Sequence, residues 1–243
     1  MTPDLAFLAA AATERLGLWQ TIINDLEIRS MVEIGVFRGL YAEAILEGCP
    51  TLSTYYMLDP WRHLDDWDKP ANRSDEHFAG FLREALERTE PHAAKRVVLR
   101  GRTTEVIDEI PDGSLDFAYV DGDHTLRGIT IDLIRVWPKL KPGGWLGGDD
   151  LSPSIFQHGD DHEPTLVFPW VLHFAEAVGS PVTILPFRQF LIEKQTTTPY
   201  DVVNLSDKPY RHRTIRSQLA LRRRRLRAKR LAERHSALPE SSG

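Results

Sequence analysis

Acidic residues and one histidine follow two apolar segments of the chain, at the point where each segment ends. Asp121, Asp123 and His124 come directly after the segment LDFAYV, and Asp149 and Asp150 come directly after GGWLGG. Both segments have the composition of buried strands. Because the carboxyl ends of neighbouring parallel strands meet at one edge of a sheet, we expect these side chains to lie close together.

Three carboxylates at one place would repel and raise one another's pKa. A hard divalent cation such as Mg²⁺ or Mn²⁺ removes this conflict, because it prefers carboxylate and water oxygens. The scarcity of cysteine and histidine nearby disfavours zinc. We therefore predict a metal site formed by Asp121, Asp149 and Asp150. A bound cation would lower the pKa of an acceptor hydroxyl and orient it. His124 is the predicted general base, with Asp121 or Asp123 as the alternative.

The same residues also have a purely structural interpretation. The Asp-Gly-Asp sequence is a common turn after a strand, His124 could cap the helix that follows, and Asp149 and Asp150 could start a short turn through Ser152. We favour the metal site, because acids that gather at the functional edge of a sheet need a reason to lie together.

The elements that must position these residues alternate along the chain. Residues 3–28 have the apolar spacing of a helix, and strand-like and helical segments then follow in turn. The five segments predicted as parallel strands are SMVEIGVF, STYYMLDPW, KRVVLRG, LDFAYVDGD and GGWLGGDD. PVTILPF and RQFLIEKQ predict a terminal antiparallel hairpin. The pattern predicts an α/β fold with a Rossmann-like, doubly wound, mostly parallel sheet of seven strands.

Further candidate binding residues follow the first three predicted strands. In the segment EIGVFRG, Gly35 allows a sharp turn and close approach of a ligand, and the next helix offers free N–H groups to an anion. Phe37 disfavours a dinucleotide, whose pyrophosphate needs a glycine at that position. Asp59 can accept two hydrogen bonds from a ribose diol. Residues 101–103 follow the third strand and can border an adenine. Each feature taken singly also fits an ordinary turn.

Taken in order, these features resemble the class I S-adenosylmethionine (SAM)-dependent methyltransferases over about residues 28–200. The resemblance points to a more specific group of enzymes at three segments, VEIGVFRG, LDPW and YVDGDHTLRGITIDLIRVWPKLKPGGWLGGDD. They are similar to the macrocin O-methyltransferase-like enzymes, which methylate sugar hydroxyls with a divalent metal. The resemblance implies a SAM- and metal-dependent O-methyltransferase that acts on a small hydroxylated acceptor, a sugar or a glycan unit.

The resemblance also assigns cofactor contacts to residues of this chain. It implies that Glu33 and Gly35 line the methionine and ribose side of SAM and that Asp59 holds the ribose hydroxyls. The residues implied to border the adenine are Gly101, Arg102 and Thr103, and Asp121 completes the predicted cofactor set. Family members often have serine or glycine where this chain has Leu40 and Tyr41, so the contacts at the methionine end differ.

Length and charge divide the chain into two parts. Residues 1–207 are predicted to form one methyltransferase domain, with an N-terminal helix within 1–28 and a lid loop at 151–169. The lid contains His158, Asp160, Asp161 and His162, for which a second metal site is the alternative. Residues 208–243 are predicted to be a basic tail, either helical or disordered, because residues 208–234 carry 12 Lys or Arg and one Glu.

Composition limits the compartment and the partners. One cysteine excludes an internal disulfide and favours a cytoplasmic protein, and no segment is apolar and long enough to span a bilayer. The tail could lie on an anionic membrane, bind nucleic acid or dock on a second subunit of a homodimer. An RNA methyltransferase recruited by the tail and a non-catalytic SAM-binding module are the alternative functions. No N-P-P-Y motif for amine acceptors follows the fourth strand.

Overall fold

The structure is a computed structural model that describes residues 4–157, 162–195, 198–208, 210, 223–224 and 227–228. Its centre is one eight-stranded sheet with the strand order β3-β2-β1-β4-β5-β7-β6-β8. The strands are β1 (Ser30–Ile34), β2 (Thr54–Asp59), β3 (Arg96–Arg100), β4 (Leu115–Val120), β5 (Leu140–Gly148), β6 (Val182–Leu185), β7 (Gln189–Glu193) and β8 (Val202–Asn204). Strands β1 to β5 are parallel, and β7 is antiparallel to both β5 and β6. The predicted α/β fold and its terminal hairpin are therefore confirmed.

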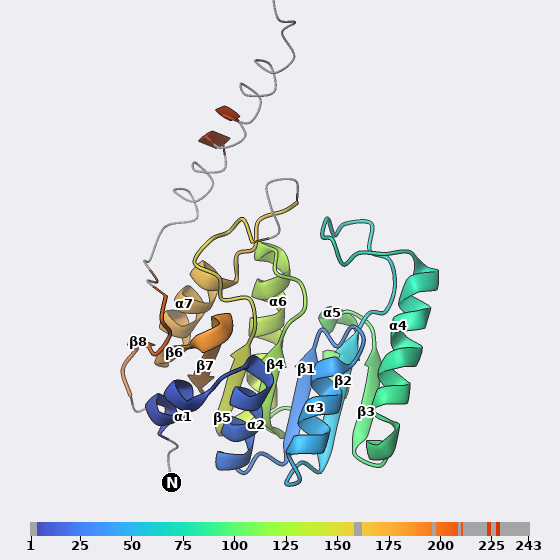
Figure 1. Cartoon of the computed structure of the whole chain (residues 1–243), viewed down its shortest axis with the longest axis horizontal. Helices are drawn as coiled ribbons and strands as arrows, with labels where there is room; N and C mark the ends of the chain where they lie inside the picture. Colours follow the sequence, from blue (N-terminus) through green and yellow to red (C-terminus); the bar gives the residue numbers. More distant parts are fainter. Residues whose placement is uncertain are drawn as a thin grey trace, which may run out of the picture.

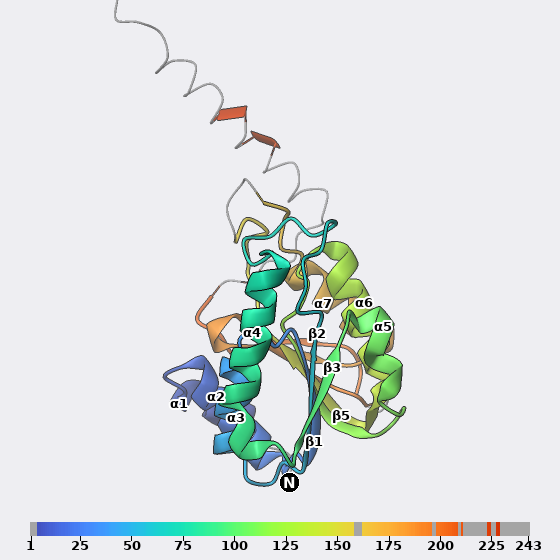
Figure 2. The same cartoon turned by 90° about the vertical axis from the view of Figure 1, so that its right-hand side faces the viewer.

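Helices cover both faces of this sheet, as the doubly wound pattern predicts. Figure 2 shows α1 to α4 on one face and α5 to α7 on the other. The helices are α1 (Leu5–Ala11), α2 (Arg15–Asp25), α3 (Leu40–Gly48), α4 (Asp75–Arg88), α5 (Thr103–Val106), α6 (Leu126–Val136) and α7 (Val167–Val178). In α6, Ile129, Leu133 and Val136 recur at helical spacing and are buried against the sheet. Two apolar cores result, one on each face.

The N-terminal segment departs from the prediction of one helix. The chain leaves the helical conformation at Ala12, passes through extended backbone at Glu14 and starts α2 at Arg15. The physical reason is the docking of α2, whose Trp19, Ile22 and Ile23 are fully buried in one of the two cores. The break places Arg15 at the carboxyl edge of the sheet, where it reaches acids that follow β4 and β5.

The C-terminal part also differs from the prediction. The predicted lid loop ends earlier than residue 169, because α7 already begins at Val167, and residues 158–161 of this loop lie outside the described residues. Strand β8 pairs in parallel with β6 and adds an eighth strand that the sequence pattern did not indicate. The predicted basic tail lies almost wholly outside the described residues. No helix in the described part of the chain is long and apolar enough to cross a bilayer.

The carboxyl ends of β1 to β5 point toward one edge of the molecule, the upper edge in Figure 1. The long connection 60–74 and the described parts of the connection between β5 and α7, residues 149–157 and 162–166, lie at this same edge. In an open parallel sheet this edge is where ligands bind.

Candidate active site

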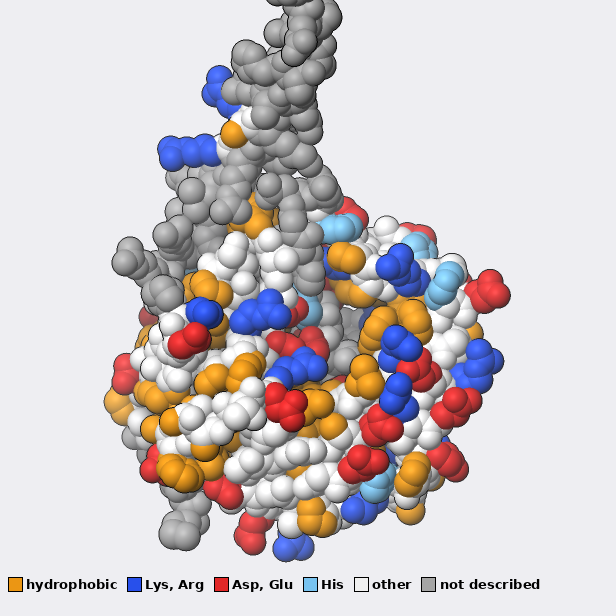
Figure 3. All heavy atoms as spheres, viewed as in Figure 1, with side chains coloured by type: hydrophobic (Ala, Val, Ile, Leu, Met, Phe, Trp, Pro, Cys, Tyr) orange, Lys and Arg blue, Asp and Glu red, His pale blue; other side chains and the backbone are white. Residues whose placement is uncertain are grey.

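A cavity of about 680 Å³ opens at the carboxyl edge of the sheet. This volume is within the range of small-molecule sites. The predicted site residues that line it are Gly35, Asp59, Arg102, Thr103, Asp121 and His124. The predicted site residues outside this lining are Glu33, Gly101, Asp149 and Asp150. Acidic, basic and hydrophobic side chains lie next to one another around a hollow in Figure 3.

Asp59, the last residue of β2, shapes one wall of the cavity. Its two carboxylate oxygens accept hydrogen bonds from the backbone N–H groups of Phe37 and Trp61, each at 2.8 Å. The indole of Trp61 in turn donates to the carbonyl oxygen of Phe37 at 2.7 Å. Asp59 thus fixes the loop between β1 and α3. Each carboxylate oxygen has a second lone pair, so the carboxylate can also accept from a ligand. Burial raises the pKa of Asp59 to about 6, although these backbone donors oppose the shift.

Gly35 is required at the end of β1 by the fold itself. Its φ of +93° is favourable only for glycine, and a Cβ there would lie 2.2 Å from the carbonyl oxygen of Asp121. The loops that follow β1 and β4 therefore touch, and Gly35 sets how closely Asp121 approaches the cavity.

The floor of the cavity near β3 contains a buried polar pair. Thr103, at the start of α5, donates its hydroxyl hydrogen to Asp132 of α6 at 2.6 Å. Both residues are buried and line the cavity. Burial raises the pKa of Asp132 to about 7, against the hydrogen bond from Thr103. The sequence analysis missed Asp132, because a single acidic residue in an amphipathic helix is normally expected on the solvent-exposed face.

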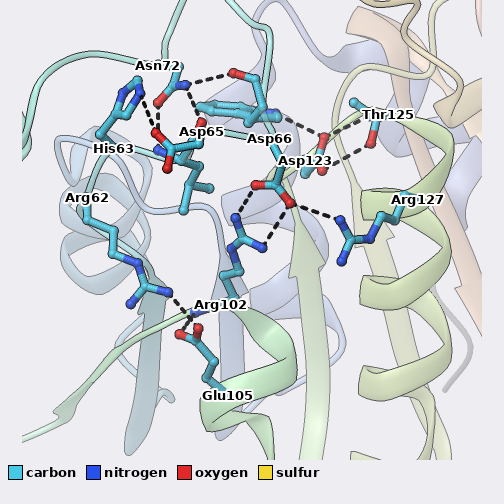
Figure 4. Close-up of polar contacts among 12 residues, drawn as sticks. Arg62, His63, Asp65, Asp66, Asn72, Arg102, Glu105, Asp123, Thr125 and Arg127 are labelled. Atoms are coloured by element: carbon cyan, nitrogen blue, oxygen red, sulfur yellow. Dashed lines mark hydrogen bonds and ion pairs between the residues drawn. The ribbon is translucent and has the colours of Figure 1, made fainter.

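Residues 60–74 form a strap that lines part of the cavity, and ion pairs hold it in place (Figure 4). Asp66 lies between Arg102 and Arg127, with its Oδ2 2.9 Å from Nη1 of Arg127. The indole N–H of Trp67 donates to Asp123 at 3.0 Å. The same carboxylate accepts from the backbone N–H of Thr125 at 2.9 Å, so Asp123 joins the strap to the start of α6.

Lys69 ties the strap to the segment before α7. Its ammonium group is 2.6 Å from the carbonyl oxygen of Glu163 and 3.3 Å from that of Pro164. The side chain is almost fully buried, and burial lowers its pKa, against the pull of nearby carboxylates. The sequence reading assigned the covering role only to the lid loop at 151–169, whereas two segments distant in sequence enclose the cavity together.

The carboxyl ends of β4 and β5 bring together three side chains that can bind a metal ion. One ligand atom from each of Asp121, His124 and Asp150 lies within 4.8 Å of the others. In the structure, the imidazole lies between the two carboxylates, 2.7 Å from Asp150 through Nδ1 and 3.3 Å from Asp121 through Nε2. Burial alone would lower the pKa of His124, but the two carboxylates outweigh it and raise the pKa to about 10. The positive imidazolium thus separates the acids.

The pKa values of the two carboxyl groups in this cluster are shifted in opposite directions. Burial raises the pKa of Asp121 to about 6, although His124 opposes the shift. Burial would also raise the pKa of Asp150. Its hydrogen bond to His124 and the charges of His124 and Arg188 outweigh this effect and hold the pKa below the usual range. Both ring nitrogens of His124 face a carboxylate, so in this arrangement neither is free to take a proton from a hydroxyl group.

Asp149 is not part of this group of three, although it shares Arg15 with Asp121. Asp150 has a left-handed backbone, with a φ of 58°, and the two successive carboxylates diverge. Oδ1 of Asp149 accepts from the side chain of Gln189 at 2.6 Å, and its Oδ2 forms an ion pair with Arg15. Oε1 of Gln189 accepts from the indole of Trp19, 2.7 Å away. A buried polar network therefore joins α2 and β7 to the end of β5, and it holds Asp149 through partners that are remote in sequence.

Glu33 lies below the edge of the sheet rather than in the cavity lining. Its side chain is 1% exposed, and its Oε2 accepts a hydrogen bond from the hydroxyl of Tyr55 at 2.7 Å. Burial raises the pKa of Glu33 to about 8, against the hydrogen bond from Tyr55. Gly101 also lies outside the cavity lining. Its N–H donates to the carbonyl oxygen of Asp59 at 3.0 Å and so helps to hold Asp59 in place.

Part of the sequence resembles known proteins. Residues 32–151 match the sequence model of a family described as a methyltransferase domain. They extend from within β1 to just past β5 and include Asp121, His124, Asp149 and Asp150. The matched segment is 120 of the 243 residues and is similar to methyltransferase domains.

Solved structures support the class I methyltransferase fold. A Staphylococcus aureus protein proposed to be a caffeoyl-CoA O-methyltransferase superimposes with a TM-score of 0.56, at 12% identity, covering 79% of this chain and 92% of that one. The O-methyltransferase TomG of Streptomyces achromogenes, in complex with SAM, gives 0.52 at 15% identity, with 79% and 90% covered. These identities are low, so the likeness concerns the fold of the methyltransferase domain.

A relative at the sequence level is an uncharacterized protein of Sinorhizobium fredii, 28% identical over 134 residues. The match covers 52% of this chain and 13% of that protein, so the chain corresponds to a small part of its length.

Proposed function

We propose that the methyltransferase domain transfers the methyl group of SAM to a hydroxyl oxygen of a small acceptor, with a divalent cation held by Asp121, His124 and Asp150. The observation that carries this proposal is the position of the three side chains. They lie at the ends of β4 and β5, and two of them line the cavity that also contains Asp59. The proposed donor site and the proposed metal site are thus next to each other.

The methyl donor fits the cavity through the residues that line it. Asp59 offers carboxylate oxygens to the ribose hydroxyls, as the resemblance implies. Thr103 and Asp132 supply buried polar atoms at the far end, where the sequence analysis predicted the adenine. Arg102 borders the mouth and, in the structure, is paired with Asp66 of the strap. The strap then shields the donor from water.

The proposed cation site has a mixed donor set. Two carboxylates and one imidazole suit Mn²⁺ better than Mg²⁺, because imidazole is a softer ligand than oxygen. The proposed ligand set differs from the one predicted from the sequence in one residue. His124 takes the place of Asp149, because the carboxylate of Asp149 already interacts with Arg15 and Gln189. Binding of a divalent cation requires a neutral imidazole, so it would displace the proton that His124 holds between the two acids.

A bound cation would lower the pKa of the acceptor hydroxyl and supply positive charge beside the reacting oxygen. In the transfer itself, a new C–O bond forms as the C–S bond of the sulfonium breaks, and the donor leaves as neutral S-adenosylhomocysteine. The hydroxyl proton must pass to a base. We assign it to Asp121, which lines the cavity and whose Oδ2 lies 3.6 Å from the guanidinium of Arg15. His124 as base is the alternative that the sequence suggested.

We propose a sugar hydroxyl as the acceptor. The support is the resemblance of the DGDH and GGDD segments to enzymes that methylate sugars, together with the exposed rings of Phe37 and Phe187, which a sugar face can cover. An aromatic hydroxyl, as in the acceptor named for the Staphylococcus aureus protein, is the competing class.

Radiolabelled SAM, Mn²⁺ or Mg²⁺ and a panel of sugars and catechols test the function directly. We expect methyl transfer that EDTA abolishes and that Mn²⁺ restores better than Mg²⁺. Calorimetric titration with Mn²⁺ provides a second readout, independent of turnover. Asp150→Asn should lose Mn²⁺ affinity by tenfold or more, whereas Asp25→Asn, at an exposed position on α2, should not. Unchanged activity in EDTA together with unchanged Mn²⁺ binding by Asp150→Asn would refute the metal role.

A further inference from the structure

The turn between β6 and β7 has an unusual backbone. Phe187 and Arg188 both have left-handed conformations, with φ values of 60° and 65°, although neither is glycine. Hydrogen bonds hold the turn in place. The side chain of Gln189 donates to the carbonyl oxygen of Phe187 at 2.8 Å, and the N–H of Leu151 donates to that of Arg188 at 2.8 Å. A strained conformation that the surroundings fix this firmly is typical of positions that serve a site.

The sheet topology places this turn beside the proposed cation site. Strand β7 runs antiparallel to β5, with Phe190 opposite Gly148, so the turn before β7 lies at the carboxyl end of β5. The order β1-β4-β5-β7 puts the cavity on one side of the cluster of Asp121, His124 and Asp150 and the turn on the other. Neighbouring strands are about 4.8 Å apart, so the turn is roughly one strand from Asp150.

Arg188 is exposed, and its guanidinium forms no ion pair or hydrogen bond with any residue in the described ranges. Its positive charge is close enough to Asp150 to lower the pKa of that carboxyl group. The neighbouring acids have other partners, since Asp149 pairs with Arg15, and Asp150 contacts His124 and Gln157. With a divalent cation between Asp121 and Asp150, and with Arg15 and Asp149 paired, none of these neighbouring acids in the described part of the chain is left to balance the charge of Arg188.

We propose that Arg188 binds an anionic group of the acceptor, a carboxylate or a phosphate, while the hydroxyl to be methylated lies at the cation. This inference rests on the proposed function and narrows its acceptor to acidic sugars. The carboxylate of SAM is not the partner, because the donor cavity lies on the other side of the cluster. The planar guanidinium can form two parallel hydrogen bonds to a carboxylate or phosphate, which fixes the orientation of the ring.

The test measures binding of matched probes to the full chain in the presence of S-adenosylhomocysteine and Mn²⁺, a mixture in which no transfer occurs. One pair is methyl glucuronide and methyl glucoside, and the other is glucose 6-phosphate and glucose. We expect the anionic member of at least one pair to bind about tenfold to a hundredfold more tightly, as for a charge-assisted hydrogen bond. The pair that shows the preference identifies carboxylate or phosphate.

Arg188→Gln should remove this preference and leave the affinity for the neutral members unchanged, whereas Arg188→Lys should keep part of it. Arg29→Gln is the matched control, because Arg29 is also exposed but precedes β1 at the opposite edge of the sheet. Thermal unfolding and SAM affinity of each variant verify that the fold is intact.

The proposal is overturned if the wild-type protein binds neither anionic probe more tightly than its neutral counterpart, or if Arg188→Gln keeps the preference. Turnover separates this failure from failure of the proposed function. Methylation of neutral acceptors alone would refute the role of Arg188 and uphold methyl transfer. Binding of anions through Arg188 without any methyl transfer would uphold the subsite and refute the proposed function.

Discussion

Replacing the buried acid of β1, Glu33→Gln, should change how the stability of the protein depends on pH. In the folded protein, burial raises the pKa of Glu33 from 4.5 to about 8. Below pH 4.5 the carboxyl is protonated in both states and has no differential effect. As the pH rises from 4.5 toward 8, the unfolded chain ionises and the folded chain does not, so the folded state loses stability. At 1.36 kcal/mol per pH unit, this loss amounts to about 5 kcal/mol over the whole window.

The glutamine variant cannot ionise but can still accept the hydrogen bond from Tyr55. The free energy of unfolding of Glu33→Gln minus that of the wild type should therefore increase by roughly 3 to 4 kcal/mol between pH 5 and pH 8. Urea titrations at four pH values measure it, with Glu47→Gln, at an exposed position on α3, as the control. Parallel stability profiles for wild type and variant would show that Glu33 is ionised in the folded protein and refute the reasoning.

The same variant tests a cofactor contact. Because Glu33 lies outside the cavity lining, we expect the SAM affinity of Glu33→Gln to remain within about threefold of the wild-type value, whereas loss of a hydrogen bond to a ligand costs about tenfold. A loss of SAM affinity of about tenfold or more would instead support the direct contact that the family resemblance implies.

Three further predictions concern the donor cavity. If ionised Asp59 holds the ribose, its pKa of about 6 should weaken SAM binding about tenfold between pH 7.5 and pH 5, and calorimetry should find this dependence flattened in Asp59→Asn. Asp66→Asn should loosen the strap and accelerate SAM release about two- to fivefold in stopped-flow measurements, and an unchanged rate would show that the strap does not gate the cavity. Gly35→Ala should lower the melting temperature more than Gly113→Ala does, because both glycines have positive φ but only the Cβ at position 35 meets backbone at 2.2 Å. Equal losses would contradict this steric argument.

The fold could be predicted because its signals are local. Alternation of apolar strands and amphipathic helices is visible over short windows, and the carboxyl ends of those strands identify the edge where Asp59, Asp121 and Asp150 lie. The break in the N-terminal helix was not predictable in this way. No glycine or proline marks residues 12–14, and the break follows from how Trp19 packs on the sheet.

The detailed composition of the site depends on contacts between distant segments. Adjacent acids at 149 and 150 look equivalent in the sequence, but the left-handed backbone at Asp150 directs one to His124 and the other to Arg15. Arg15 is 134 residues from Asp149, and such a distance leaves no trace in periodicity or motif spacing. The strap was likewise missed, because its polar residues between β2 and α4 have the composition of an ordinary loop.

The polar network around Gln189 limits how far the chain can be truncated. A fragment trimmed to the span shared with other methyltransferase domains, residues 32–151, would keep the acids at the strand ends but would lack Arg15, Trp19 and Gln189. Asp149 would then lose both of the side-chain groups that neutralise and orient it. A fragment of this chain used in a fusion protein should therefore extend from α1 through β7.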